Sequence, residues 1–403
     1  MSQQALSGLK VLEFSEFVSG PYCGRLLAGL GAEVIKIEGP CIGDKARRWG
    51  PFPQDLPHPE KSGLFLFLNV NKKGVTLNVE TAAGKKLFLD LVKWANVLVE
   101  DKAPGDMERL DFDYGCLSKF NPSLVMTSIT GFGQTGPYRD YRACDLINTH
   151  MSGMAFGNPA EGVDDPESQP PLKQPGHTGD FMIGLSAGVC TMSAVLGQKR
   201  GGPGQHIDLS HQEALASVGR QELAFYVGGK VTPTRQKGRK VRGGILYPTK
   251  DGWVCLWAGP FLGKLVEMMG NPDWANTEIF QDRNQLQQHM DEFNALVTVW
   301  TSEHTSAEVE QASIDHGVPC SSVRNPGDVV RDEQLAFRKF FVEFEHPVAG
   351  KLKYPGAPYK LSATPWSARI PAPLLGEHNR QVYGEMLGYS AQGLLKLEQA
   401  GVI

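Results

Sequence analysis

The sequence predicts an α/β protein with a parallel sheet, because short apolar strands alternate with helical segments along its first half. A strand–helix–strand unit opens the chain, with strands expected over 11–14 and 33–37 and a helix over 24–30 that ends at Gly31. The length of 403 residues exceeds what one ordinary hydrophobic core contains, so two domains are expected.

The later elements continue this alternation. Helices are expected over 81–94, over 181–197 and from Ser210 onward. Strands are expected over 76–79, 96–100, 124–130 and 205–209. The basic stretch 230–244 that follows is typical of an exposed connection, so the large domain is expected to end before it.

A smaller α+β unit is expected after this connection, with a strand over 253–258 and helices over 261–269 and 285–300. Three parts follow from this pattern: a large α/β catalytic domain over 1–225, a smaller α+β domain over 226–325, and a C-terminal segment over 326–403 that returns to the large domain.

The composition is that of a soluble globular protein, with 41% hydrophobic and 21% charged residues. A formal net charge of −4 gives no support for binding to nucleic acid or to a membrane surface. The seven cysteines are scattered without any CxxC pair, which favours reduced thiols in a cytoplasmic protein over disulfides or a zinc site. No signal-peptide pattern opens the sequence, and the uncharged run 181–197 is too rich in Gly, Ser and Thr to be interpreted as a membrane span.

Asp180 is the strongest candidate for chemistry, because it stands directly before that uncharged run. A carboxylate at the positive end of a buried helix is stabilised as an anion, and the neighbouring Gly179 would leave it free to attack an activated carbonyl. The alternative is that Asp180 is an ordinary N-cap, which is a common role of aspartate. The motif alone leaves both interpretations open.

Three other motifs compete with Asp180. Gly131–Gly136 matches the GxGxxG pattern of dinucleotide sites, but no clean helix follows it, which favours a tight turn. Gly184–Gly188 matches the GxSxG elbow of serine hydrolases, but it lies inside the helical run, which favours close helix packing. His206 and His211 could in principle ligate a metal, but no carboxylate partner is evident, which favours a structural role.

Basic residues near the ends of strands are the candidates for binding a phosphate group. Lys102 and Arg109 flank the turn after the strand 96–100, and ligands of open α/β sheets bind beyond such strand ends. Lysine offers a point charge and arginine a bidentate fork to phosphate oxygens. Lys72–Gly74 is interpreted as a turn between two strands, where its lysines would be solvated.

Taken together, these segments resemble the family III CoA-transferases, a group that includes formyl-CoA:oxalate and crotonobetainyl-CoA:carnitine CoA-transferases. The likeness covers essentially the whole chain, in the segments Leu6–Phe14, Ser19–Pro21, Leu30–Glu38, Gly43–Asp44, Asn69–Lys72, Val99–Glu100, Pro104–Gly105, Gly131–Tyr138, Gly179–Asp180, Gly204–Gln205 and Pro373–His378. The resemblance implies a doubly wound, Rossmann-like large domain, a smaller α+β domain, and two chains threaded through one another as an interlocked, ring-like dimer. It also implies an enzyme that takes acyl-CoA as substrate, with no tightly bound cofactor and no metal.

The same resemblance implies that Asp180 is the nucleophile. Seven further residues match positions of the CoA site: Val18, Ser19, Leu77, Asp101, Lys102, Arg109 and Arg142. Val18 stands where the oxalate enzyme has a polar side chain near the reacting carbonyl, and Asp101 replaces an asparagine. The oxalate enzyme's glycine-rich loop also has no obvious counterpart around residues 258–260, so oxalate and formate are not expected as substrates.

The activity implied is ping-pong transfer of CoA from a donor thioester to a carboxylic acid, through an aspartyl anhydride and an aspartyl-CoA thioester. Succinyl-CoA is one expected donor, with an aryl-substituted dicarboxylate such as benzylsuccinate or a carnitine-type acid as acceptor. The partner is a second copy of the chain or a homologous subunit. Two alternatives stay open, a non-catalytic CoA-binding subunit and an α-methylacyl-CoA racemase, although Cys144-Asp145 replaces the racemases' His-Asp pair and a neutral thiol is a poor general base.

Overall fold

The computed structural model describes residues 4–159, 165, 168–230, 232, 245–257, 259–277, 279 and 283–403. The chain forms two compact units, of which the first comprises Met1–Asn158, Pro171–Pro233 and Lys339–Ile403, and the second comprises Pro159–Pro170 and Thr234–Arg338. Both ends of the chain therefore contribute to the first unit. The domain limits expected from the sequence, at residues 225 and 325, stay predictions. Most of the basic connection 230–244 lies outside the described residues.

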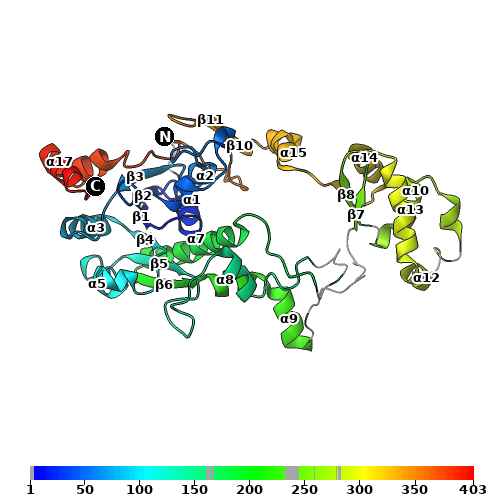
Figure 1. The fold of residues 1–403 in the computed structure, drawn as a ribbon, viewed down its shortest axis with the longest axis horizontal. Coiled ribbons are helices and arrows are strands. Elements are labelled where there is room, and N and C mark those ends of the chain that lie inside the picture. The colour runs from blue at the N-terminus through cyan, green and yellow to red at the C-terminus, as the bar shows by residue number, and fades with distance from the viewer. Residues whose placement is uncertain are drawn as a thin grey trace. The chain divides into compact units, whose positions relative to one another are not determined.

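A six-stranded parallel sheet forms the centre of the first unit, which confirms the α/β class (Figure 1). Its strands lie in the order β3-β2-β1-β4-β5-β6. Their bounds are Lys10–Phe14 (β1), Glu33–Glu38 (β2), Lys72–Thr76 (β3), Val97–Glu100 (β4), Val125–Thr130 (β5) and Gln205–Ser210 (β6). The strand order reverses between β1 and β4, and in such sheets ligands bind beyond the carboxyl ends of the strands at this point.

Helices cover both faces of the sheet, because successive strand residues point to opposite sides. Val11 packs in the cluster that includes α1 and α7, and Leu12 packs in the cluster that includes α3 and the C-terminal helices. The first face carries α1 (Ser19–Gly29), α7 (Thr178–Lys199) and α8 (His211–Val218). The second face carries α3 (Ala82–Trp94), α5 (Tyr114–Phe120), the π-helix Arg380–Met386 and α17 (Ala391–Gln399).

The smaller elements of the first unit lie in its connections and its C-terminal part. They are the 3-10 helices Lys45–Arg48 and Pro53–Asp55, the helices α2 (Gly63–Leu68), α4 (Asp106–Arg109), α6 (Asp145–Met151) and α9 (Arg220–Gly229), and the antiparallel strands β10 (Phe341–His346) and β11 (Gly350–Pro355). The C-terminal segment is attached to the sheet by a hydrogen bond from the Tyr383 hydroxyl to the carbonyl oxygen of Thr76, at 2.9 Å.

The second unit contains an antiparallel sheet in the order β7-β8-β9, formed by Ile245–Pro248, Trp253–Leu256 and Cys320–Ser322. Its helices are α10 (Leu262–Met268), α12 (Arg283–Gln288), α13 (Met290–Ser302), α14 (Ser306–His316), α15 (Pro326–Arg331) and α16 (Glu333–Phe337), with 3-10 turns at Gly259–Phe261 and Asp273–Asn276. The single helix expected over 285–300 is thus two helices, which are separated at His289.

The turn expected at Lys72–Gly74 is wrong, because these residues begin strand β3. Lys72 is fully buried, and its ammonium donates to the carbonyl oxygen of Pro21 at 2.7 Å and to Asn69 at 2.9 Å. It also pairs with the Glu13 carboxylate at 2.8 Å. A lysine that usually favours solvent is buried here because three acceptors satisfy all of its donors.

Lys36 extends this buried network toward the loop that precedes α1. Its ammonium lies 3.0 Å from Glu13 and 2.7 Å from Asp44, and it donates to the Ser15 carbonyl oxygen at 2.9 Å. Burial by itself would lower the pKa of Lys36, but Asp44 and Glu13 raise it above its ordinary value. Asp44 in turn accepts a hydrogen bond from the backbone N–H of Phe17 at 2.9 Å. The network therefore fixes the backbone between β1 and α1.

Helix α7 is the one helix among the described residues that could span a bilayer by length and composition. It packs instead against the sheet and α1, as a core helix does, with Ile183 and Ala187 fully buried. A Cβ atom at Gly184 would lie 2.7 Å from the carbonyl oxygen of Ser19, so glycine permits this close packing. The Ser186 hydroxyl donates to the Met182 carbonyl oxygen within the helix, so the GxSxG match is not a nucleophile elbow.

Replacement Lys36→Met is expected to lower the free energy of unfolding by about 3–5 kcal/mol, because it leaves the buried Asp44 carboxylate without its cation. Urea unfolding followed by circular dichroism measures the change. Lys93→Met is the matched control, since Lys93 is exposed and, among the described residues, pairs only with Asp90 across one helical turn. This variant should change stability by less than about 1 kcal/mol. Equal midpoints for the two variants would contradict a stabilising role of the network.

Candidate active site

Asp180 is the third residue of α7, because the helix begins at Thr178 and not at Phe181. The N-cap residue is His177, so the N-cap interpretation of Asp180 is wrong. The backbone N–H of Asp180 donates instead to Asp145, at 3.2 Å from Oδ1. A Cβ atom at Gly179 would lie 2.3 Å from the same oxygen. Gly179 therefore makes room for a carboxylate from another helix, and this leaves the Asp180 side chain free to face the cavity.

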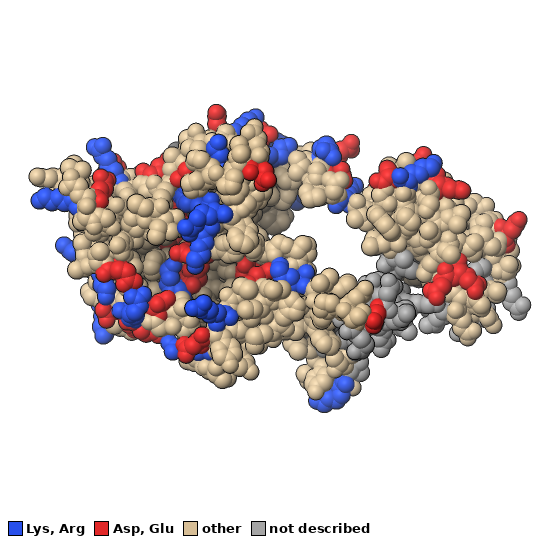
Figure 2. Space-filling view, viewed as in Figure 1, with Lys and Arg blue, Asp and Glu red and all other residues tan. Residues whose placement is uncertain are grey.

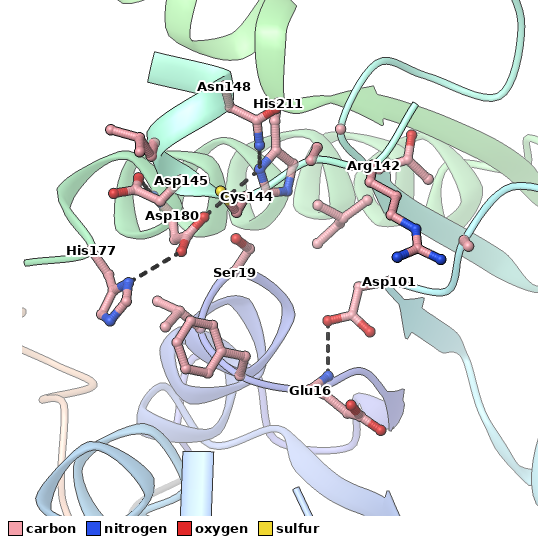
Figure 3. A pocket seen from close by; sticks show the side chains of 18 of the residues that line it. Glu16, Ser19, Asp101, Arg142, Cys144, Asp145, Asn148, His177, Asp180 and His211 are labelled. Carbon is pink, nitrogen blue, oxygen red and sulfur yellow. Dashed lines mark hydrogen bonds and ion pairs between the residues drawn. The ribbon is translucent and has the colours of Figure 1, made fainter. Parts of the chain in front are cut away.

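A cavity of about 1020 Å³ lies beyond the carboxyl ends of β1 and β4, where the strand order reverses (Figure 3). Its walls come from the segments that follow β1, β2, β4 and β5, from the segment 173–180 that leads into α7, and from the start of α8. Pockets for small ligands usually measure ~300–1,000 Å³, so this one accommodates a large substrate. Asp180 lines it.

Two histidines flank the Asp180 carboxylate. Nδ1 of His177 lies 3.6 Å from one oxygen, and Nδ1 of His211 lies 3.8 Å from the other. Burial lowers the pKa of His177 and lowers the pKa of His211 to about 4, so both rings are neutral at pH 7. Within the described residues no lysine or arginine lies within 4 Å of these oxygens, so Asp180 is a buried carboxylate without a cation.

The electrostatic environment of Asp180 differs from the sequence-based expectation. Burial raises its pKa to about 7, and the neighbouring Asp145 carboxylate adds to the rise, while Lys173 opposes it. The helix N-terminus was expected to stabilise the anion, but desolvation and a like charge outweigh that effect here. A group with this pKa is partly ionised near pH 7 and is more basic than an exposed aspartate.

Lys173 holds Asp145 in place. Its ammonium lies 2.7 Å from Asp145 Oδ2, and it also donates to the carbonyl oxygens of Gln174 at 2.9 Å and Gly176 at 2.5 Å. The lysine therefore ties the segment before α7 to the carboxylate that orients Asp180.

Six of the eight site residues expected from the sequence line this cavity: Val18, Ser19, Asp101, Lys102, Arg142 and Asp180. Leu77 does not line it, because its side chain is buried in the core beside α3. Arg109 does not line it either; it is exposed and forms a bidentate pair with Glu80 at 3.0 and 3.1 Å. The roles of these residues in binding CoA stay predictions.

The cations of the cavity differ in how they are paired. Lys102 lies 3.6 Å from Glu16, and Asp101 accepts a hydrogen bond from the Glu16 backbone N–H at 2.8 Å. Burial raises the pKa of Asp101 to about 6, against the opposing effect of Lys102. Arg142 forms no ion pair or hydrogen bond with the described part of the chain, and Figure 3 shows it directed toward the cavity. Arg142 is therefore free to bind an anion.

The remaining motifs have structural roles. The glycine-rich turn Gly131–Gly136 follows β5 without opening a helix, and its Gln134 N–H donates to Asp208 at 3.1 and 3.0 Å. His206 lies 2.8 Å from the Ser128 hydroxyl. No cluster of three or more potential metal ligands occurs in the described ranges.

Sequence reasoning missed several residues that surround Asp180. His177 and the aromatic rings of Phe17 and Trp49 form a contacting group, with ring centroids 4.8 to 5.5 Å apart, and all three line the cavity. His211 was considered only as a metal ligand. Phe17 lies in a loop, with a positive φ of 68°. Loop residues follow neither helix nor strand periodicity, so no signal in the sequence indicated that Phe17 lines the cavity.

Comparison with known proteins supports the resemblance to family III CoA-transferases over almost the whole chain. The family model described as CoA-transferase family III matches residues 6–379. This chain belongs to CoA-transferase family III. It is therefore an enzyme of the CoA-transferase class, whose members take CoA thioesters as substrates.

Individual relatives extend the comparison. The succinyl-CoA–D-citramalate CoA-transferase of Chloroflexus aurantiacus is 30% identical over 405 residues, which cover 99% of this chain and 98% of that protein. Subunit BbsE of the succinyl-CoA:(R)-benzylsuccinate CoA-transferase of Thauera aromatica is 30% identical over 402 residues, which cover 95% of each. The crystal structure of a CAIB/BAIF family protein from Brucella suis superimposes with a TM-score of 0.85 at 26% identity and covers 96% of this chain and 100% of that one.

The buried charge at Asp180 should make the stability of this CoA-transferase depend on pH. In the folded state the pKa is about 7, well above the ordinary value of 3.8, so stability falls as pH rises from about 4 to about 7, by roughly 1.4 kcal/mol per pKa unit. Asp180→Asn removes this loss. The free energy of unfolding of this variant, measured with urea, is therefore expected to exceed that of the wild type only slightly at pH 4.5 and by a few kcal/mol at pH 8.

The matched control for this measurement is Asp55→Asn, because Asp55 is exposed. Its difference from the wild type should stay constant across the same pH range. An Asp180→Asn advantage that does not grow with pH would contradict the raised pKa.

Proposed function

We propose that this enzyme transfers CoA from an acyl-CoA donor to a carboxylic acid by ping-pong covalent catalysis on Asp180. The observation that carries the proposal is a buried carboxylate with no cationic partner in the described residues, open to a cavity of about 1020 Å³. A carboxylate that is neither paired nor fully solvated retains its nucleophilicity toward a thioester carbonyl.

In the first half-reaction an Asp180 oxygen attacks the thioester carbon, and the C–S bond breaks to release CoA thiolate and leave a mixed anhydride. The thiolate then attacks the Asp180 carbonyl carbon, so the donor acid leaves as its carboxylate and an aspartyl-CoA thioester remains. The acceptor carboxylate reverses these two steps. Every intermediate retains the activation of the acyl group, so the cycle needs no other energy source.

The CoA moiety is proposed to bind along Val18, Ser19, Asp101, Lys102 and Arg142, which line the cavity. Leu77 and Arg109 lie outside the cavity, and their contacts with CoA stay predictions from the sequence. The unpaired guanidinium of Arg142 supports this assignment, since its donors are available to an anionic group. Glu16 and Glu80 already pair with Lys102 and Arg109, so phosphate groups would have to compete with these carboxylates. Binding energy from the nucleotide part would hold the thiolate near Asp180 between the two steps.

Succinyl-CoA is the proposed donor, because three relatives that are 30% identical are named for it. The proposed acceptor is an aryl-substituted dicarboxylate such as benzylsuccinate, and a carnitine-type acid is the second choice. The cluster of Phe17, Trp49 and His177 beside Asp180 favours an aromatic substituent, because aromatic rings bind one another edge to face.

The proposed enzyme is cytoplasmic and works as an interlocked dimer, either of two copies or with a homologous subunit. Exposed apolar side chains on two helices support an assembly, including Val189 on α7, which is 69% exposed, and Val227 on α9, which is 73% exposed. The relative BbsE is named as a subunit. Since this chain keeps Asp180, it is proposed as the catalytic subunit in either case.

Incubation with succinyl-CoA and then hydroxylamine tests the mechanism. Hydroxylamine converts an acylated aspartate to a hydroxamate, so we expect a mass increase on the peptide that contains Asp180. Asp180→Asn should show neither the increase nor CoA exchange between succinyl-CoA and labelled succinate. Ser186→Ala is the control, because the Ser186 hydroxyl donates to the Met182 carbonyl oxygen within α7, and this variant should keep both the mass increase and the exchange. Modification of any other residue would contradict the assignment.

The rate should also follow the ionisation of Asp180. Only the carboxylate is nucleophilic, so kcat/KM is expected to rise with pH, about tenfold per unit below a midpoint near 7, and to level off above it. Glu100 is the necessary control, because burial also raises its pKa to about 7, although it does not line the cavity. Glu100→Gln should keep the midpoint. Loss of the pH dependence in Glu100→Gln would assign it to Glu100 instead.

A further inference from the structure

His211 is placed to do chemistry that the two-step scheme leaves unassigned. It is the first residue of α8, directly after β6, and its ring lines the cavity that contains Asp180. Its Nδ1 lies 2.9 Å from the amide nitrogen of Asn148, which is buried. An amide nitrogen can only donate, so Nδ1 is the acceptor and the proton of the neutral ring is on Nε2.

The Nε2–H group is a donor without an acceptor. Within the described residues it forms no hydrogen bond, and Figure 3 shows it on the side of the ring away from Asn148, facing the cavity. A purely structural histidine would direct this group to a protein acceptor or to bulk solvent, because an unsatisfied buried donor is destabilising. The side chain is only 14% exposed, so its exposed part faces the cavity that receives the substrate.

We propose that His211 is a catalytic residue that donates a hydrogen bond from Nε2 to the acyl oxygen when Asp180 attacks the thioester. The inference rests on the proposed function of Asp180. In this step the new C–O bond forms, the π electrons of the carbonyl move onto its oxygen, and Nε2–H stabilises that oxyanion without giving up its proton. The oxygen then re-forms the carbonyl as the C–S bond breaks and the thiolate leaves.

The protonation state of the ring suits this role. Burial keeps His211 neutral at pH 7, and a neutral imidazole is a good donor in a buried site, whereas an imidazolium would pair with Asp180 and reduce its nucleophilicity. Nδ1 has no proton, so it does not donate to the Asp180 oxygen 3.8 Å away. Asn148 therefore sets the tautomer that leaves the nucleophile free and directs the proton to the cavity.

One alternative donor for the oxyanion is already occupied. Backbone N–H groups at the start of a helix commonly stabilise oxyanions, but the N–H of Asp180 donates to Asp145. His211 approaches Asp180 from α8, on the side opposite His177, so its proton is available to a substrate oxygen from a different direction.

The rate of Asp180 acylation by succinyl-CoA, followed by rapid quench and hydroxylamine trapping, tests the role. Loss of one oxyanion donor typically lowers the rate ~10²–10³-fold, so His211→Ala should slow acylation by that factor with little change in KM. His211→Gln should restore most of the rate, because the glutamine amide can donate from near the position of Nε2. His206→Gln, which changes a histidine outside the cavity, should stay at the wild-type rate.

The outcomes separate the two hypotheses. Adduct formation at the wild-type rate in His211→Ala would overturn the role of His211 and leave that of Asp180 intact. Absence of any Asp180 adduct in the wild type would overturn both. A rate that His211→Gln does not restore, in a variant that melts at the wild-type temperature, would also contradict donation from this position.

The tautomer gives a readout that does not depend on activity. In protein labelled with ¹³C and ¹⁵N at histidine, the His211 signals are those missing from His211→Gln. Their ¹³C and ¹⁵N shifts should report a neutral ring protonated on Nε2 at pH 7, and Asn148→Ala should weaken this preference. A ring protonated on Nδ1, or doubly protonated at pH 7, would overturn the proposal.

Discussion

The burial of one carboxylate beside another is the constraint on which this active site depends. Asp145 accepts the backbone N–H of Asp180 and so occupies the donor that would otherwise bind an anion at the start of α7. It can approach so closely only because residue 179 is glycine. The Asp180 side chain is left buried, without a cation, and with a pKa raised to about 7 by burial and by Asp145. The burial that costs folding free energy at this position also makes the Asp180 carboxylate more basic, and a more basic oxygen is a better nucleophile.

The rest of the large unit holds this arrangement in place. The charges on Glu13, Lys36 and Asp44 satisfy one another below the cavity, and Asp44 fixes the backbone at Phe17, whose ring touches His177. Buried ion pairs contribute little net free energy to folding. The main effect of this network is therefore the single geometry that it enforces. The loop between β1 and α1 can therefore line the cavity without being rebuilt when a substrate binds.

Charge is distributed unevenly around the cavity. Of the two cations that line the cavity and match the CoA site, Lys102 pairs with Glu16, while Arg142 is unpaired in the described residues. Arg109 lies outside the cavity and pairs with Glu80. The rings of His177 and His211 flank the Asp180 carboxylate, and within the described residues no lysine or arginine lies within 4 Å of it. In the proposed mechanism, a CoA thioester would be held by its distant charged part, and the reacting carbonyl would lie among groups that do not neutralise Asp180.

The sequence by itself determined the α/β class and most of the strands of the parallel sheet, and it singled out Asp180, which lines the cavity, because hydrophobic periodicity and ordered motifs are local signals. It misjudged Lys72, whose burial depends on acceptors from Glu13, Asn69 and Pro21. It considered His211 only as a metal ligand, because the proposed role of this histidine depends on Asn148, some sixty residues earlier in the chain. The sequence also predicted that the charge of Asp180 is stabilised, which is wrong. A helix N-terminus can be recognised in a sequence, whereas desolvation cannot. Only the tertiary structure decided the tautomer of His211, the pKa of Asp180 and the free Nε2–H donor of His211. Each of these is set by side chains that the fold brings together from separate strands and helices.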